Sequence, residues 1–319
     1  MNSGLPVVCL GEALVDRLGP PGGDPAIDGP VDDRLGGAPA NVACGLARLG
    51  SDAAFLGRLG ADAIGDRFAT LFRQRAVDFG AVQWDAQRPS RVVLVRRGID
   101  GERQFQGFAG GEGLTFADQA LASVDLPIKS RWLLVGTLLL AAVASAESLR
   151  GAIAQAKARG IALAVDVNWR PTFWDATADP GAGPSPNAKA AIQPLLEAAT
   201  LLKVSRDEAL WFFASADPAV IRAALPQRPD VVVTDGAAPV CWCLGDQAGI
   251  QPALKPPAVV DTTGAGDAFT AGLLHRWSAS PTERVRFAVA CGALVCAGAG
   301  GIDPQPTEAQ VEAFLGAVS

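Results

Sequence analysis

Short apolar runs alternate with longer segments of helical pattern along most of the chain. Uninterrupted apolar runs of this length are typical of strands that are buried on both faces, so they predict a parallel sheet. The predicted strands are Val7–Leu10, Ala53–Leu56, Trp132–Val135, Ile161–Val167, Leu201–Val204, Val231–Thr234 and Ala258–Val260. With helices between them, the fold class is α/β: a doubly wound, mostly parallel sheet with helices on both faces. Ligands of such folds bind beyond the carboxyl ends of the strands.

Helix boundaries are marked by capping residues and glycines. A side-chain oxygen at the first position and a glycine after the last turn satisfy the free backbone groups at the two ends of a helix. The predicted helices are Asn41–Leu49, which Gly50 stops, Asp62–Phe79, a helix capped by Ser145 that runs to Arg159, and Ala268–Trp277.

Two segments interrupt the alternation of strands and helices. Arg91–Arg97 and Arg103–Phe108 flank an Asp-Gly turn within 99–102, which predicts an antiparallel hairpin. Leu14–Leu35 has strand-like ends around a Pro/Gly-rich middle. We expect one domain over residues 1–319, with a small β-strand lid formed by about 14–35 and 91–108.

The charge balance excludes several partners. The 319 residues include 27 Lys and Arg and 33 Asp and Glu, for a net charge of −6, and the pI is near 4.9. Because phosphate backbones and anionic membranes attract concentrated Lys and Arg, we expect no nucleic-acid and no membrane partner. The longest apolar stretch, Trp132–Ala146, is shorter than the roughly 20 residues that span a bilayer.

Six cysteines and one histidine narrow the chemistry further. There is no Cys-x-x-Cys pair and no Cys–His metal spacing, so buried, reduced thiols are expected. His275 is expected at a helix surface or helix end rather than in a catalytic triad. Met1–Leu10 has no basic segment before its apolar run, which argues against a signal peptide. Together these features predict a cytoplasmic protein.

The strongest chemical signal is the segment Asp261–Phe269, which reads DTTGAGDAF between a predicted strand and a predicted helix. Gly264 and Gly266 leave backbone N–H groups unobstructed at the helix N-terminus, which favours an anion pocket. Asp267 lies in the first helical turn, where the helix dipole is expected to lower the pKa of its carboxyl. Such a weak base suits phosphoryl transfer, whose transition state is loose. The alternative is a structural turn with a capping Asp.

A second glycine motif opens an earlier helix. Gly36 and Gly37 allow backbone amides to approach a small ligand, and Asn41 offers both a donor and an acceptor. Asp16, shortly after the first strand, can accept hydrogen bonds from two sugar hydroxyls. A simple helix cap is the alternative for this motif. No Gly-Lys pair occurs, so there is no Walker A loop.

These residues resemble the two signatures of the ribokinase-like (PfkB-type) sugar kinases, and the resemblance covers essentially the whole chain. Within that family the chain is most similar to bacterial and plant fructokinases. The supporting segments are 11–16, 36–50, 55–60, 100–103, 166–171, 203–208 and 261–269. The family fold, a doubly wound α/β domain with a small β lid, agrees with the two interruptions described above.

The resemblance implies a role for each matching residue. Asp267 would be the base on the accepting hydroxyl, with Gly264, Ala265 and Gly266 as the anion hole and Arg170 near the γ-phosphate. The sugar would be held by Asp16, Gly36, Gly37, Asn41 and Phe105. ATP would be bordered by Lys203, Ser205, Thr234 and Gly236, together with Gly264 and Gly266. Glu208 would hold Mg²⁺ through water, and Asp261 and Thr263 would supply oxygens to a monovalent cation, K⁺ in some relatives. The alternatives are a surface salt bridge for Arg170 and an exposed helical position for Glu208.

The implied function is an ATP-dependent sugar kinase that converts D-fructose to fructose 6-phosphate. A 2-keto-3-deoxygluconate kinase, a ribokinase and a nucleoside kinase are alternatives within the same fold. An idle sugar-binding regulator on the kinase scaffold is an alternative from another class. The expected ligands are a small sugar, ATP and Mg²⁺, and the lid hairpin offers a surface for a homodimer.

Overall fold

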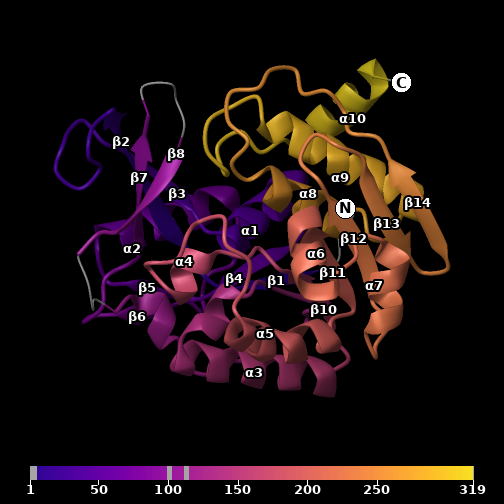
Figure 1. Ribbon diagram of the computed structural model, residues 1–319, viewed down its shortest axis with the longest axis horizontal. Helices are drawn as coiled ribbons and strands as arrows, with labels where there is room; N and C mark the ends of the chain where they lie inside the picture. The colour runs from indigo at the N-terminus through magenta and orange to yellow at the C-terminus, as the bar shows by residue number, and fades with distance from the viewer. Residues whose placement is uncertain (1–5, 99–102, 111–114, 319) are drawn as a thin grey trace.

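The computed structural model describes residues 6–98, 103–110 and 115–318, and its centre is one large sheet (Figure 1). In spatial order its strands are β14 (Gln247–Gln251), β13 (Val240–Leu244), β12 (Asp230–Thr234), β11 (Leu201–Ser205), β10 (Ala162–Asp166), β9 (Trp132–Val135), β1 (Val7–Leu10) and β4 (Ala53–Leu56). The strands from β12 to β4 pair in parallel, whereas β13 and β14 pair antiparallel at one edge. The chain runs from β1 outward to β4 and then returns to β9 on the other side of β1, which makes this a doubly wound sheet.

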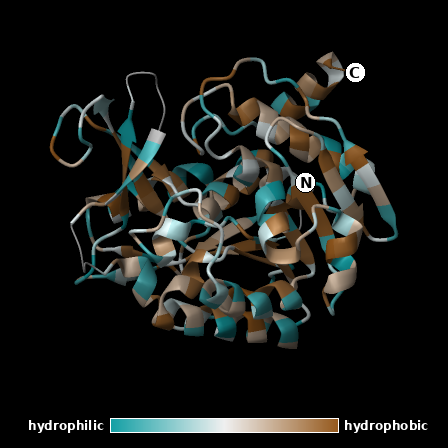
Figure 2. Cartoon of the chain, viewed as in Figure 1, coloured by the Kyte–Doolittle hydropathy of each residue, from teal (hydrophilic) through white to brown (hydrophobic). Residues whose placement is uncertain are grey.

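Both faces of the sheet are covered because successive side chains of each strand point to opposite sides. Val7 and Cys9 join one apolar core, and Val8 and Leu10 join the other. The first core is closed by α1 (Ala38–Leu49), α2 (Ala63–Arg75), α8 (Ala265–His275), α9 (Pro281–Val295) and α10 (Glu308–Ala317). The second is closed by α3 (Val143–Ala158), α5 (Pro186–Ala198), α6 (Arg206–Phe213) and α7 (Pro218–Ala224). Figure 2 shows the apolar strands between helices whose outer faces are polar.

Six of the seven predicted strands are confirmed to within about two residues, the usual uncertainty of such boundaries. The seventh, Ala258–Val260, is wrong: this segment is an irregular connection, and Val259 and Val260 are 70% and 61% exposed. A short apolar run alone does not distinguish a buried strand from a segment that crosses the surface. The only backbone pairing recorded here within the described chain is between the amides of Val260 and Asp261 and the carbonyl of Cys296.

All four predicted helices form, but their boundaries differ from the prediction. Helices α1 and α8 each begin three residues earlier than predicted. Asp62 does cap α2, since its carboxylate accepts from the Gly65 amide, but the helix ends at Arg75 and Ala76 is left-handed with φ 57°. Ser145 lies inside α3 rather than at its start. Its hydroxyl donates to the Leu139 carbonyl in the preceding 3-10 turn, Leu138–Ala141, so it ties that turn to the helix.

A second, smaller sheet stands beside the main one and has the order β3 (Asp32–Gly36), β2 (Leu14–Pro21), β7 (Val92–Arg97) and β8 (Arg103–Phe108). The two interrupting segments therefore do pair, and β7 and β8 form the predicted antiparallel hairpin. The predicted turn within 99–102 lies outside the described residues. The remaining elements are the two-stranded sheet β5 (Arg58–Gly60) and β6 (Gln83–Asp85), the short helix α4 (Pro171–Trp174) and the 3-10 turn Ala117–Ala120.

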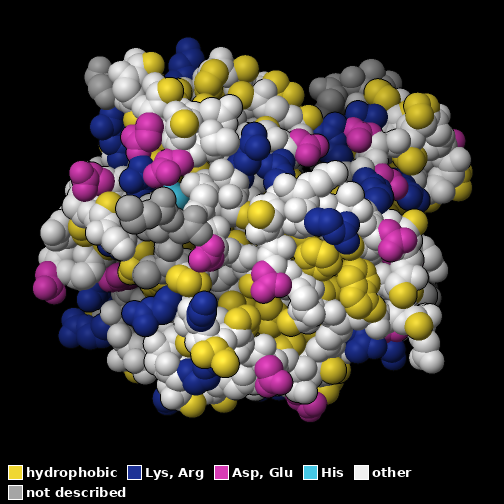
Figure 3. All heavy atoms as spheres, turned by 180° about the vertical axis from the view of Figure 1, so that it is seen from behind, with side chains coloured by type: hydrophobic (Ala, Val, Ile, Leu, Met, Phe, Trp, Pro, Cys, Tyr) yellow, Lys and Arg dark blue, Asp and Glu magenta, His cyan; other side chains and the backbone are white. Residues whose placement is uncertain are grey.

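The structure also tests the expectations for the histidine and the cysteines. His275 ends α8, as expected, but it is buried rather than exposed, and its Nδ1 lies 2.8 Å from the Ser51 hydroxyl. The six cysteines are free thiols, and four of them are buried as expected, whereas Cys241 and Cys243 are half-buried. No helix in the described part of the chain has the length and apolar character needed to cross a membrane. Basic and acidic side chains are interspersed on the face seen in Figure 3.

Candidate active site

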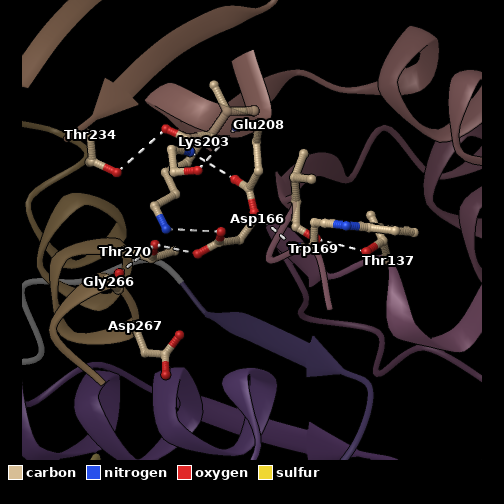
Figure 4. A network of polar contacts seen from close by, with 12 residues as sticks. Thr137, Asp166, Trp169, Lys203, Glu208, Thr234, Gly266, Asp267 and Thr270 are labelled. Carbon is tan, nitrogen blue, oxygen red and sulfur yellow. Dashed lines mark hydrogen bonds and ion pairs between the residues drawn. The ribbon is translucent and has the colours of Figure 1, made fainter. Parts of the chain in front are cut away.

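The candidate site forms where the carboxyl ends of neighbouring parallel strands meet the N-terminus of α8 (Figure 4). Glu12 follows β1 after one residue, and Arg170 follows β10 after a short loop. Ser205 and Thr234 end β11 and β12. The doubly wound topology thus gathers at one edge of the sheet residues that are far apart in the sequence.

The turn before α8 has the geometry of an anion site. Gly264 is left-handed, with φ 78°, and a Cβ at this position would lie 2.4 Å from the Cα of Gly301. Only glycine fits such a close approach. Asp261 fixes the turn, because one carboxylate oxygen accepts from the amide and hydroxyl of Thr263 and the other accepts from the amide of Gly300. The first amides of α8, beginning at Ala265, are therefore held at a rigid helix N-terminus.

Asp267 lies in the first turn of α8, and its carboxylate accepts a 2.7 Å hydrogen bond from the Asn41 side-chain amide. The expectation of a lowered pKa is wrong. Burial, and then the charge of Asp166, raise the pKa of Asp267 to about 6, although Asn41, Lys203 and Arg170 act in the opposite direction. Removal from water outweighs the helix dipole, so Asp267 is a stronger base than the sequence suggests.

The second glycine motif meets the first one through Asn41, near the start of α1. Gly37 has φ 100°, and a Cβ there would lie 2.6 Å from the carbonyl oxygen of Glu12. This contact brings the start of α1 against the loop that follows β1. The Asn41 Oδ1 is buried and has no hydrogen-bond partner among the described residues, so it can accept from a ligand. The structure thus joins the two glycine motifs through the contact between Asn41 and Asp267.

The other predicted sugar residues lie on the small sheet. Asp16 is on β2, and a side chain at Gly36 would come within 3.1 Å of its carboxylate. Phe105 is on β8, where its ring lies 5.2 Å from that of Phe108. Asp16 and Gly36 are therefore neighbours, and no contact of Phe105 with the other predicted sugar residues is recorded in the described part of the structure.

Arg170 is exposed and immediately precedes α4. Its guanidinium donates to the Trp169 carbonyl, and its charge lowers the pKa of Asp267, so it acts electrostatically on the site. The alternative of a surface salt bridge finds no support, since the described residues provide no carboxylate partner for Arg170.

Glu208 is buried, so the alternative of an exposed helical position is wrong. It forms a capping box with Ser205: its carboxylate accepts from the Ser205 amide at 2.7 Å, and the Ser205 hydroxyl accepts from the Glu208 amide. The other carboxylate oxygen accepts from the Trp169 amide, also at 2.7 Å. Both oxygens keep lone pairs that can accept from water, which fits the predicted water-mediated contact with Mg²⁺.

The predicted nucleotide residues lie along the ends of β11 and β12. Thr234 ends β12, and its hydroxyl lies 3.4 Å from the Val204 carbonyl (Figure 4). Gly236 follows in a left-handed conformation, with φ 53°. Lys203 is buried on β11 and forms an ion pair with Asp166.

Sequence reasoning missed three residues near the turn. Asp166, the last residue of β10, is buried between Lys203 and Thr270. Glu12 is buried too, and burial raises its pKa to about 8. The signal available for Asp166 and Glu12 was an acidic residue at or just after the carboxyl end of an apolar strand. Thr270 gave no signal, because an α-helix interior accommodates a threonine for many reasons.

The fold and site define a phosphotransferase with a small polar acceptor. The family model of the pfkB family carbohydrate kinases matches residues 6–308, and the chain belongs to this family. It is 33% identical to "Probable fructokinase-6, chloroplastic" of Arabidopsis thaliana, over 98% of this chain and 83% of that protein. It is 33% identical to a fructokinase of Salmonella typhimurium, over 93% and 95%.

Solved structures agree with this assignment. The fructokinase of Xylella fastidiosa with bound ATP has a TM-score of 0.83 and 25% identity, covering 100% of this chain and 99% of that one. The fructokinase of Vibrio cholerae O395, bound to fructose, ADP and a calcium ion, has a TM-score of 0.80 and 28% identity, covering 98% and 99%. The predicted family and fold class are therefore confirmed.

Proposed function

We propose that this carbohydrate kinase transfers the γ-phosphate of ATP to the 6-hydroxyl of D-fructose. The observation that carries the proposal is the joining of the two glycine motifs, in which Asn41 on α1 holds Asp267 beside the turn at Gly264. The relatives named above support the choice of fructose. The retained carboxylate and rigid turn weigh against an idle sugar-binding regulator.

In the proposed mechanism, the sugar lies between the small sheet and the start of α8. Asp267 accepts the proton of the primary hydroxyl and orients that hydroxyl toward the γ-phosphorus. The amides of Ala265 and Gly266 and the charge of Arg170 stabilise the negative charge on the transferred group. Asp16, Gly37 and Asn41 hold the remaining hydroxyls, and the strand ends at Ser205 and Thr234 border the nucleotide.

A panel of acceptors tests this proposal. We expect kcat/KM for fructose to exceed that for ribose, 2-keto-3-deoxygluconate and adenosine by at least about tenfold, which corresponds to about 1.4 kcal/mol of transition-state binding. Coupled detection of ADP measures it, and omission of the sugar is the control. If another acceptor leads, the kinase chemistry stands and the choice of fructose falls. If no acceptor releases ADP, the regulator is the better interpretation.

We expect phosphotransfer to require a divalent cation. Mg²⁺ would screen the ATP phosphates and would be reached through water by Glu208, whose hard carboxylate oxygens suit this ion. Excess EDTA should lower the initial rate at least about tenfold, and an excess of Mg²⁺ should restore it. An unchanged rate in excess chelator contradicts this prediction.

Asp261 and Thr263 remain the predicted contacts of a monovalent cation, but the positive charge of the Arg34 guanidinium already lies beside Asp261. Arg34 Nη1 is 3.7 Å from Asp261 Oδ2 and is buried without a hydrogen-bond partner among the described residues. We therefore expect replacement of K⁺ by tetramethylammonium to have little effect on kcat. In Arg34→Gln, K⁺ should activate up to about fivefold, the scale of a partly exposed ion pair. Strong K⁺ dependence of the unaltered enzyme contradicts this.

Three further proposals concern the whole protein. The small sheet β3–β2–β7–β8 acts as a lid over the sugar, and its hairpin provides the surface for a homodimer. A cytoplasmic location suits an enzyme that uses ATP and carries free thiols. Small sugars and ATP, rather than nucleic acids or membranes, remain the predicted partners. Sedimentation of the purified protein tests the dimer.

A further inference from the structure

A buried polar network lies against the first turn of α8 (Figure 4). Lys203 Nζ is 3.0 Å from Asp166 Oδ1, and the Thr270 hydroxyl donates to Asp166 Oδ2 at 2.9 Å. All three residues are buried, with at most 9% of each residue exposed. The network joins three elements, because Asp166 ends β10, Lys203 is on β11 and Thr270 is on α8.

The same network contacts the first turn of α8. The Thr270 hydroxyl also lies 3.0 Å from the carbonyl of Gly266, and a Cβ on Gly266 would be 3.1 Å from Lys203 Nζ. The ammonium group therefore lies directly against the glycine whose amide faces the proposed phosphate position. A charged group buried this deeply is costly unless it is paired, and Asp166 supplies the pairing.

Both charges of the pair also act on Asp267. Asp166 raises the pKa of Asp267 and Lys203 lowers it. The other groups that face this carboxylate are Arg170, which lowers its pKa, and Glu12, which interacts with it as a like charge. Asn41 donates the hydrogen bond described above.

We propose that the Asp166–Lys203 ion pair, held to α8 by Thr270, is a positioning device for catalysis. It fixes the first turn of α8 at Gly266 and sets the local charge balance that lets Asp267 accept a proton from the sugar. The inference rests on the proposed kinase function. It assigns to Asp166 and Thr270 a part in the reaction, and it gives Lys203 a role through the turn rather than through direct contact with ATP.

The test compares the pH dependence of kcat/KM in charge variants of the pair. Asp166→Asn removes the negative charge and should move the acidic limb of the profile about 1 pH unit lower. Lys203→Met removes the positive charge and should move the limb to higher pH by a similar amount. The double variant, Asp166→Asn with Lys203→Met, should bring the limb back toward that of the unaltered enzyme. A purely structural pair would lower activity in each variant and leave the limb in place.

Three controls separate the alternatives. Lys189→Met removes an exposed lysine on α5 and should change neither the limb nor KM. If Lys203 contacts ATP directly, Lys203→Met raises KM for ATP and leaves the limb unmoved, and the proposal fails. Thr270→Ser keeps the hydroxyl and should retain kcat, whereas Thr270→Val should lower it. Because Lys203→Met leaves a buried carboxylate unpaired, it could fail to fold; Asp166→Asn and the double variant then decide.

A second measurement does not depend on activity. The difference in Tm between the unaltered protein and Asp267→Asn, followed across pH 6, reports the titration of Asp267 directly. Asp166→Asn should move the pH midpoint of this change in Tm difference to lower pH as well. If no sugar is phosphorylated but the transition moves, the proposed function fails and the charge coupling stands. If the enzyme is active and neither the limb nor the transition moves, the coupling is overturned.

Discussion

Asp267→Ala is expected to lower kcat by about 10²–10⁴-fold, the usual cost of losing a general base. The carboxylate lies at the start of α8, beside the rigid turn and within 2.7 Å of Asn41. In this position it can orient a hydroxyl toward the transferred phosphoryl group without contacting the nucleotide base. KM for ATP should therefore change little. Steady-state kinetics with saturating Mg²⁺-ATP measure both constants.

Asp267→Asn is the matched control, since it keeps the shape and the contact with Asn41 but loses the basic oxygen. It should be nearly as inactive as the alanine variant. Retention of more than about a tenth of kcat by either variant would sink the assignment of Asp267 as the base.

The raised pKa of Asp267 gives the same assignment a pH signature. A base works in its ionised form, so kcat/KM should fall as pH drops through about 6, the pKa that burial gives this carboxyl. The acidic limb should be absent from the residual activity of Asp267→Asn. A limb near pH 4 would instead mean that the carboxyl has the pKa of an exposed aspartate.

Most of the fold follows from the apolar pattern because the parallel strands are buried on both faces. Runs such as Val7–Leu10 and Trp132–Val135 have no polar position to confuse the assignment. The same reasoning fails at Ala258–Val260, where the apolar side chains are exposed. A run of three residues has no periodicity, and only its neighbours in space decide whether it is buried.

The sequence predicts those residues of the candidate site whose type is dictated by the backbone conformation. Gly264 and Gly37 hold left-handed or extended positive-φ conformations in close contact with other backbone, and only glycine serves there. The charges of the site were not predictable in the same way. The pKa of Asp267 depends on Asp166, a residue that is 101 positions earlier and reaches the site through the sheet. The residues next to Asp267 in the sequence indicate the effect of the helix dipole, but they do not indicate that its carboxyl is buried.

Asp16→Ala is expected to raise KM for fructose by about 10–100-fold and to change KM for ATP less than about twofold. A carboxylate that accepts from sugar hydroxyls contributes roughly 1.5–3 kcal/mol, because hydrogen bonds to charged groups are the stronger ones. Asp16 is on β2, and its carboxylate lies next to Gly36, at the entry to the helix that carries Asn41. This places it at the proposed acceptor end of the site, away from the strand ends that border the nucleotide.

The matched control for Asp16 lies on the same small sheet. Asp33 pairs with Arg17 across the two strands and forms a salt bridge with it. Asp16 pairs with the neighbouring position on β3, Arg34. Neighbouring cross-strand pairs point to opposite faces of a sheet, so Asp33 lies on the face away from Asp16. Asp33→Ala should therefore leave KM for fructose nearly unchanged. Equal effects of the two variants, or a larger effect of Asp16→Ala on ATP than on fructose, would show that Asp16 supports the small sheet rather than the sugar.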